Sequence, residues 1–161
     1  MSIKKYFAIA DNTITNAYKA NLTTRGVSGN MGQSDISEVF SIYGQQASSS
    51  VELSRVLTKF PIDKVITDRT NNDIPASGSV DFYLRFFNAK HSSTLPTNYT
   101  LVAAAVSQSW EEGKGLDMED YSYKTYEGTG ANWINASSGS AWRGEKATAV
   151  INCVAESSLN D

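Results

Sequence analysis

Five carboxylates lie close together in the C-terminal third of the sequence, at Glu111, Glu112, Asp117, Glu119 and Asp120. Two carboxylates facing each other across a cleft can hydrolyse a glycosidic bond. Carboxylate oxygens also suit calcium, which takes about six to eight oxygen ligands, and Asp117, Glu119 and Asp120 are the candidate ligands. A solvated acidic loop is the third interpretation, and we place it first because these residues stand beside glycines in a loop.

The remaining groups that could carry out catalysis are isolated. His91 is the only histidine and Cys153 the only cysteine. One histidine cannot build a multi-histidine metal site, and one cysteine excludes both an internal disulfide framework and a multi-cysteine zinc site. A Ser-His-Asp relay cannot be read from a single histidine among abundant Ser and Asp residues. We therefore expect no enzyme and no catalytic residue.

Large aromatic side chains form a second group in the same third of the chain, at Trp110, Tyr121, Tyr123, Tyr126, Trp133 and Trp142. Such residues can cap the open end of a β-structure core. They are also favoured as anchors of protein interfaces, and their rings can stack on sugars. We predict that these six residues form the contact surface, while the capping interpretation remains open beside it.

The bulk composition indicates one folded domain over residues 1–161. Hydrophobic residues make up 40% of the chain and charged residues 19%, which is typical of a globular protein. The formal net charge is −3 without a basic cluster, so nucleic acid is not an expected partner. The apolar stretch at residues 6–10 is shorter than a signal-peptide core, and no run is long enough for a membrane span. We expect synthesis in the host cytoplasm.

The elements that would position these residues are short strands. Residues 79–87 give the clearest pattern, because Val80, Phe82, Leu84 and Phe86 alternate with Asp81, Tyr83, Arg85 and Phe87, the period of a half-buried strand. Further strands are expected at residues 5–10, 13–18, 38–43, 51–60, 99–107 and 147–154. The apolar residues of 51–60 also have helical spacing, but the β-rich context and Pro61 at its end favour a strand. Residues 63–79 are expected to be a polar connection, and residues 109–140 a long irregular region. The pattern predicts an all-β, antiparallel sandwich that is jelly-roll-like and has little helix.

The order of several segments resembles the DNRLRE-type (disaggregatase-related) β-sandwich module. The matching blocks are Asp11-Asn12-Thr13-Ile14, the turn at residues 29–34, the strand at residues 54–62 with its Arg-x-Leu-x-x-Phe-Pro-Ile pattern, the strand at residues 80–86, and Ser109-Trp110-Glu111-Glu112-Gly113. Together they span about residues 8–142. In cellular proteins such modules resemble carbohydrate-binding modules, and the resemblance carries no catalytic residues. After Trp142 the pattern departs from the family. Either the module is a shortened version, which would have an exposed sheet edge, or its last strand at residues 146–154 closes the sandwich differently.

A closer resemblance is to uncharacterised virion-associated proteins of marine tailed phages. These proteins share the blocks at residues 87–91, 94–96 and 130–135. The resemblance implies a non-enzymatic structural or assembly protein of a bacteriophage particle, at the capsid surface, neck or tail, whose partners are other virion proteins or copies of itself. The alternative is a carbohydrate-binding β-sandwich module that recognises cell-surface glycans. Neither implies a membrane partner, and calcium is the one cofactor left open.

Overall fold

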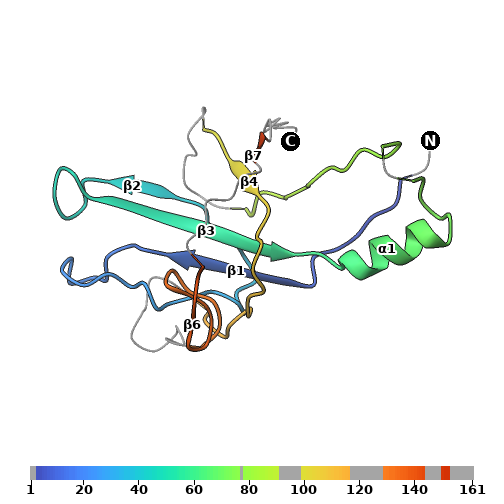
Figure 1. The fold of residues 1–161 in the computed structure, drawn as a ribbon. Helices are drawn as coiled ribbons and strands as arrows, with labels where there is room; N and C mark the ends of the chain where they lie inside the picture. Colours follow the sequence, from blue (N-terminus) through green and yellow to red (C-terminus); the bar gives the residue numbers. More distant parts are fainter. Residues whose placement is uncertain (1–2, 77, 91–98, 117–128, 144–149, 153–161) are drawn as a thin grey trace.

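A computed structural model describes residues 3–76, 78–90, 99–116, 129–143 and 150–152 of the chain. Seven strands and one helix are assigned within these ranges (Figure 1). The strands are short and belong to three small sheets, with one longer central strand. The described part is therefore β-rich, as the sequence predicts.

The largest sheet is built on β3, Val51–Lys59, which lies between β1, Ala10–Thr15, and β2, Ser41–Tyr43. Both pairings are antiparallel. Ala10 lies opposite Lys59 and Thr15 opposite Ser54, while Ser41 lies opposite Leu53. The β3 sequence is rich in β-branched and leucine residues, which favour a pleated strand. The strands expected at residues 51–60, 38–43 and 13–18 are therefore present, although their bounds shift by a few residues.

The two edges of this sheet differ. Beside β1, the backbone N–H of Met31 donates to the Thr13 carbonyl at 3.1 Å, and Asn30 forms an isolated bridge with Ile14. The side chains from Asn12 to Thr15 are buried on both faces of β1. All three residues of β2 are exposed, by contrast. Within the described residues, one edge of the sheet is covered and the other has no strand beside it.

The hydrophobic core is small. Its central cluster consists of Ile14, Leu57 and Ala131, with Trp110, Trp133 and Trp142 packed against it from the side. Polar residues are buried in greater number than is usual, among them Asn12, Asn30, Glu52 and Asn132, each exposed by 1% or less. Buried polar groups cost free energy unless they are hydrogen-bonded, so their partners decide how this core holds together.

The prediction that residues 63–79 form a polar connection is wrong for the first half of this range, because helix α1 occupies Ile62–Thr70. Pro61 stands just before the helix, where a missing N–H costs nothing and the fixed φ suits the first turn. Asp63 in the first turn and Arg69 in the last complement the helix dipole. At nine residues, α1 is too short to cross a membrane, and no helix of the described residues meets that requirement.

The C-terminal strands form two separate pairs. β4, Val102–Ala104, pairs antiparallel with β7, Val150–Asn152, and β5, Asn135–Ser137, forms a hairpin with β6, Ser140–Ala141. β4 and β7 lie within the predicted strands at 99–107 and 147–154. Val102 is 63% exposed, however, although it belongs to an apolar run of the sequence. The hairpin gives order to part of the region expected to be irregular.

Two predicted strands are not formed as expected. Residues 3–8 have no strand, and β1 begins at Ala10. Residues 80–90 also have no regular secondary structure, and they run as an open segment between the α1 end of the molecule and β4 (Figure 1). None of residues 80–90 makes a backbone–backbone hydrogen bond to another described residue. The strongest alternation in the sequence therefore has no strand partner within the described chain.

Candidate functional site

The three described tryptophans of the predicted contact surface lie against the core. Trp110, Trp133 and Trp142 are half-buried beside the central cluster. The indole N–H of Trp142 donates to the Asn132 carbonyl at 2.7 Å, and the Arg55 guanidinium lies 4.4 Å from the centre of the Trp133 ring. A ring face covered by a guanidinium is not open to a sugar. These positions fit the capping interpretation, and a binding role for the tryptophans stays a prediction.

Three asparagines are buried, and two of them, Asn12 and Asn30, join segments that lie far apart in sequence. The Asn12 amide donates to the Ala131 carbonyl at 2.9 Å, and its oxygen accepts from the Met31 N–H at 3.0 Å. The Asn30 oxygen accepts from the Gly115 N–H at 2.8 Å, and its amide donates to the Thr129 carbonyl at 2.7 Å. An amide side chain offers both donors and an acceptor, so each of these two asparagines binds two backbone groups of other segments.

The third asparagine shapes a turn. The Asn132 oxygen accepts from the backbone N–H groups of Ile134 and Asn135, at 2.9 and 2.8 Å. Glycines then allow the neighbouring backbones to approach, since a Cβ on Gly32 would overlap Glu112 and a Cβ on Gly115 would overlap Asn30. Sequence reasoning missed this network. The alternation of Asn and Gly at residues 29–32 was its only local signal.

Two of the five clustered carboxylates are held by backbone amides. Glu111 accepts from the Ser138 N–H at 3.0 Å, and Glu112 accepts from the Asp11 N–H at 2.9 Å. Both border an open pocket of about 370 Å³, whose other lining residues are Gly113, Lys114, Thr129, Gly130 and Ser138. Because each carboxylate already binds an amide of a neighbouring segment, both serve to anchor the chain.

The other predicted site residues lie outside the described ranges. These are Tyr121, Tyr123 and Tyr126 of the contact surface, and the calcium candidates Asp117, Glu119 and Asp120. His91 and Cys153 lie outside them too. In the described part of the chain, no group of three or more His, Cys, Asp and Glu residues could hold a metal ion.

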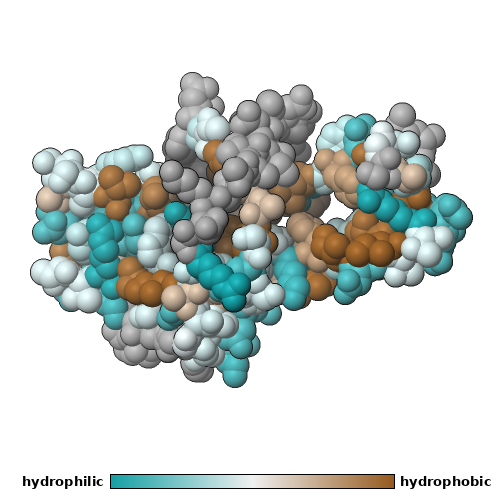
Figure 2. All heavy atoms as spheres, viewed as in Figure 1, coloured by the Kyte–Doolittle hydropathy of each residue, from teal (hydrophilic) through white to brown (hydrophobic). Residues whose placement is uncertain are grey.

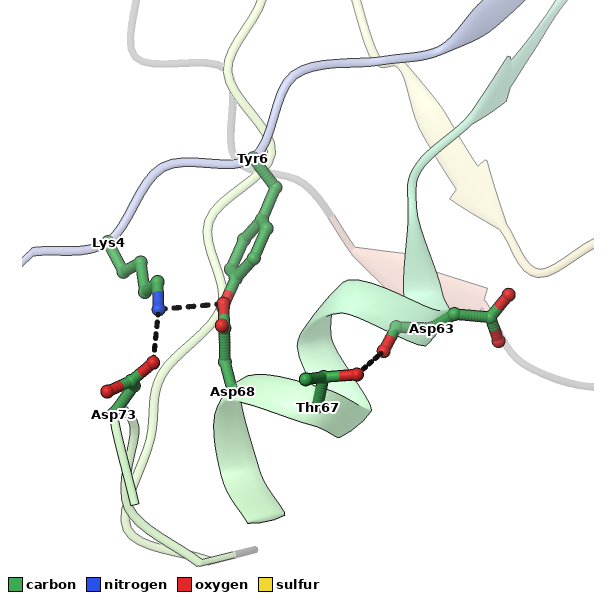
Figure 3. Close-up of polar contacts among 6 residues, drawn as sticks. All are labelled: Lys4, Tyr6, Asp63, Thr67, Asp68 and Asp73. Atoms are coloured by element: carbon green, nitrogen blue, oxygen red, sulfur yellow. Dashed lines mark hydrogen bonds and ion pairs between the residues drawn. The ribbon is translucent and has the colours of Figure 1, made fainter. Parts of the chain in front are cut away.

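A polar cluster fastens the N-terminal segment to α1 (Figure 3). Lys4 Nζ lies 2.8 Å from Asp68 Oδ2 and 3.3 Å from Asp73 Oδ2, and the Tyr6 hydroxyl donates to Asp68 Oδ2 at 2.7 Å. The hydrogen bond from Lys4, and then the one from Tyr6, holds the pKa of Asp68 below its ordinary value of 3.8. The bond to Asp68 raises the pKa of Lys4, and burial raises that of Tyr6. Such a satisfied group is structural, since it leaves little capacity for a ligand.

The most unusual surface is apolar. In the described residues, seven hydrophobic side chains are buried and three of these are alanines, whereas many large hydrophobic side chains are exposed. Figure 2 shows brown, apolar side chains on this face, both toward the α1 end and toward the β2 end. Residues 80–87 contain the densest run of exposed large hydrophobic side chains, and we call them the apolar segment. Its Phe82, Tyr83, Leu84, Phe86 and Phe87 are all 44–88% exposed. Exposed contiguous apolar surface of this kind marks an interaction site.

Exposure along the apolar segment still alternates. Phe82, Leu84 and Phe86 are 62%, 44% and 60% exposed, whereas Tyr83 and Phe87 are 88% and 80% exposed. The Arg69 guanidinium at the end of α1 lies 5.6 Å from the centre of the Phe82 ring. One face of the segment is therefore turned partly toward the chain, and the other face is turned outward. The faces are those that the sequence alternation predicts.

Any functional assignment of this chain rests on the geometry described above. No family model matches the chain, and no curated protein or solved structure is significantly similar to it.

Proposed function

We propose that the chain is a non-enzymatic assembly protein of a bacteriophage particle, one that binds neighbouring virion subunits through its exposed apolar surface. The observation that supports this most is the apolar segment, whose aromatic side chains are exposed and whose backbone groups have no backbone partner among the described residues. Burial of such side chains contributes about 1.5–3 kcal/mol each. A protein that leaves so many exposed gains stability when a neighbour covers them.

Strand edges support the same proposal. Neither β2 nor the apolar segment has a described strand on its outer side, and an unpaired edge invites pairing with another chain. We propose that the antiparallel, jelly-roll-like sandwich is completed in the assembled state, when neighbouring subunits supply the missing layer. The tryptophans do not support the glycan-binding alternative, because they lie against the core and Arg55 lies over Trp133.

Mass spectrometry of purified phage particles tests the proposal. We expect the chain to be present in gradient-purified particles, in a fixed ratio to the major capsid protein through successive gradients. An abundant host protein from the same lysate serves as the control for carry-over, and its ratio should fall at each step. The proposal is overturned if the chain is abundant in infected-cell lysate and is lost from particles together with the host protein.

A further inference from the structure

The apolar segment has a self-complementary sequence. If two copies lie antiparallel with Tyr83 opposite Tyr83, each residue lies opposite the one equally far on the other side of Tyr83. Asp81 then lies opposite Arg85 of the second copy, and Arg85 lies opposite its Asp81. On the other face, Phe82 lies opposite Leu84 and Val80 opposite Phe86. Opposite charges and apolar side chains that lie directly opposite each other stabilise a pair of strands.

Several observations show that the segment is available for such pairing. Tyr83 and Phe87 are 88% and 80% exposed. Asp81 has no hydrogen bond or ion pair with any other described residue, and among the described residues Arg85 contacts only the Phe87 ring, whose centre lies 4.8 Å from its guanidinium. The backbone of residues 80–90 has no described backbone partner. An extended pair would satisfy the backbone groups and the charges at once.

We propose that two copies of this chain associate through residues 80–87, which pair as antiparallel strands about a two-fold axis at Tyr83. This inference rests on the proposed assembly function and names a second copy as the occupant of the apolar segment. An interface of this type is isologous, because the same patch serves both subunits. The axis keeps the two Phe82–Leu84–Phe86 faces on the same side, so they form one continuous apolar surface.

Charge reversal provides the first test. Asp81→Arg alone brings two positive charges opposite each other, and Arg85→Asp alone brings two negative charges together. We expect each variant to weaken self-association by about tenfold or more, because like charges directly opposite destabilise a strand pair and each occurs twice. Mixing the two variants places opposite charges at both positions and should restore association, as should the double variant. Sedimentation velocity over a range of concentrations measures all four samples.

Cross-linking provides the second test, in a Cys153→Ser background. Tyr83→Cys should form an intermolecular disulfide under mild oxidation, because opposed residues have Cα atoms about 4.5–5.5 Å apart, within disulfide reach. Phe87→Cys is the matched control, since it is similarly exposed but lies opposite Ser79 of the other copy. It should cross-link with Ser79→Cys when the two are mixed, and not with itself. Both substitutions are at exposed positions, so the fold should survive.

The two proposals fail in different ways. A wild-type chain that sediments as a monomer at all concentrations overturns the strand pairing. Self-association that charge reversal leaves unaffected also overturns it, as does a disulfide that forms as readily in the Phe87→Cys variant as in the Tyr83→Cys variant. None of these results removes the chain from the particle, where other subunits could cover the segment. Absence from purified particles overturns the assembly function itself.

Discussion

The Asn30 side chain accepts a hydrogen bond from the Gly115 N–H at 2.8 Å, joining two residues 85 positions apart. Asn30 is fully buried and also donates to the Thr129 carbonyl. The turn at residues 29–34, the segment at Gly115 and the segment at Thr129 therefore meet at one side chain. The stability of this region should depend on it more than on any single apolar contact.

Asn30→Ala should lower the free energy of unfolding by about 3 kcal/mol, because it leaves two buried backbone groups without partners. Chemical denaturation measures the loss. Asn21→Ala is a suitable control, since Asn21 also accepts from two backbone N–H groups, at 3.0 Å each, but is exposed to solvent. It should cost about 1 kcal/mol or less. Equal losses for the two variants would contradict the role assigned to burial.

Gly115→Ala should destabilise the protein by about 3 kcal/mol or more, because the added methyl would overlap the Asn30 backbone. Gly44→Ala is the matched comparison. Gly44 lies in the turn between β2 and β3 with φ of +72° and open space around it, so an alanine there incurs only the left-handed strain of about 1 kcal/mol. Thermal melting of the two variants should rank them in this order, and the opposite order would refute the close approach of the two segments.

Trp133→Ala should lower the free energy of unfolding by about 3 kcal/mol, because the ring packs on the core cluster and lies under Arg55. Trp133→Phe keeps an apolar ring and should cost less. Self-association of the folded fraction should stay unchanged in both. If instead assembly or glycan binding falls while the melting temperature barely moves, Trp133 is an interface anchor, as the sequence interpretation proposed.

Asp68→Asn should lower the melting temperature by a few degrees at neutral pH. The pKa of Asp68 is depressed in the folded chain, so its stabilisation is present above the ordinary value of 3.8 and is lost as the pH falls through the lower, folded-state pKa. The difference between wild type and variant should therefore shrink in acid. Asp63→Asn, on the same helix but directed away from the cluster, loses only the first-turn charge and should lower the melting temperature less than Asp68→Asn (Figure 3). A difference that persists unchanged in strong acid would refute the ionic contribution.

The sequence predicts the central sheet best, because β1, β2 and β3 depend on local alternation. The sequence prediction misses helix α1 because it assigns Pro61 only to the end of the strand at residues 51–60. Proline is equally suited to precede a helix. The apolar segment shows a different limit of prediction from sequence. Its alternation predicts a half-buried strand, whereas residues 81–87 form no strand and are exposed, because no periodicity can specify whether the strand partner belongs to the same chain.

The candidate site was predictable only in part. Trp110, Trp133 and Trp142 were expected to lie together, and the described structure does place them around one core cluster. The asparagine network was not foreseen, because Asn12, Asn30 and Asn132 lie in or next to turn-rich stretches that pattern rules assign to the surface. Asn12 and Asn30 bind residues about 85 to 119 positions away, and such contacts leave no trace in local periodicity.

The Asn12 side chain and the Ala131 carbonyl, which share a hydrogen bond, are 119 positions apart in the sequence, and this separation affects folding during translation. At about 5–20 residues per second, translation needs roughly 6 to 24 seconds to proceed from one partner to the other. During that time the β1–β3–β2 sheet can form, but its buried amides have only water or a chaperone to bond with. The nascent chain should therefore mature late and remain sensitive to proteases until its C-terminal third has been synthesised.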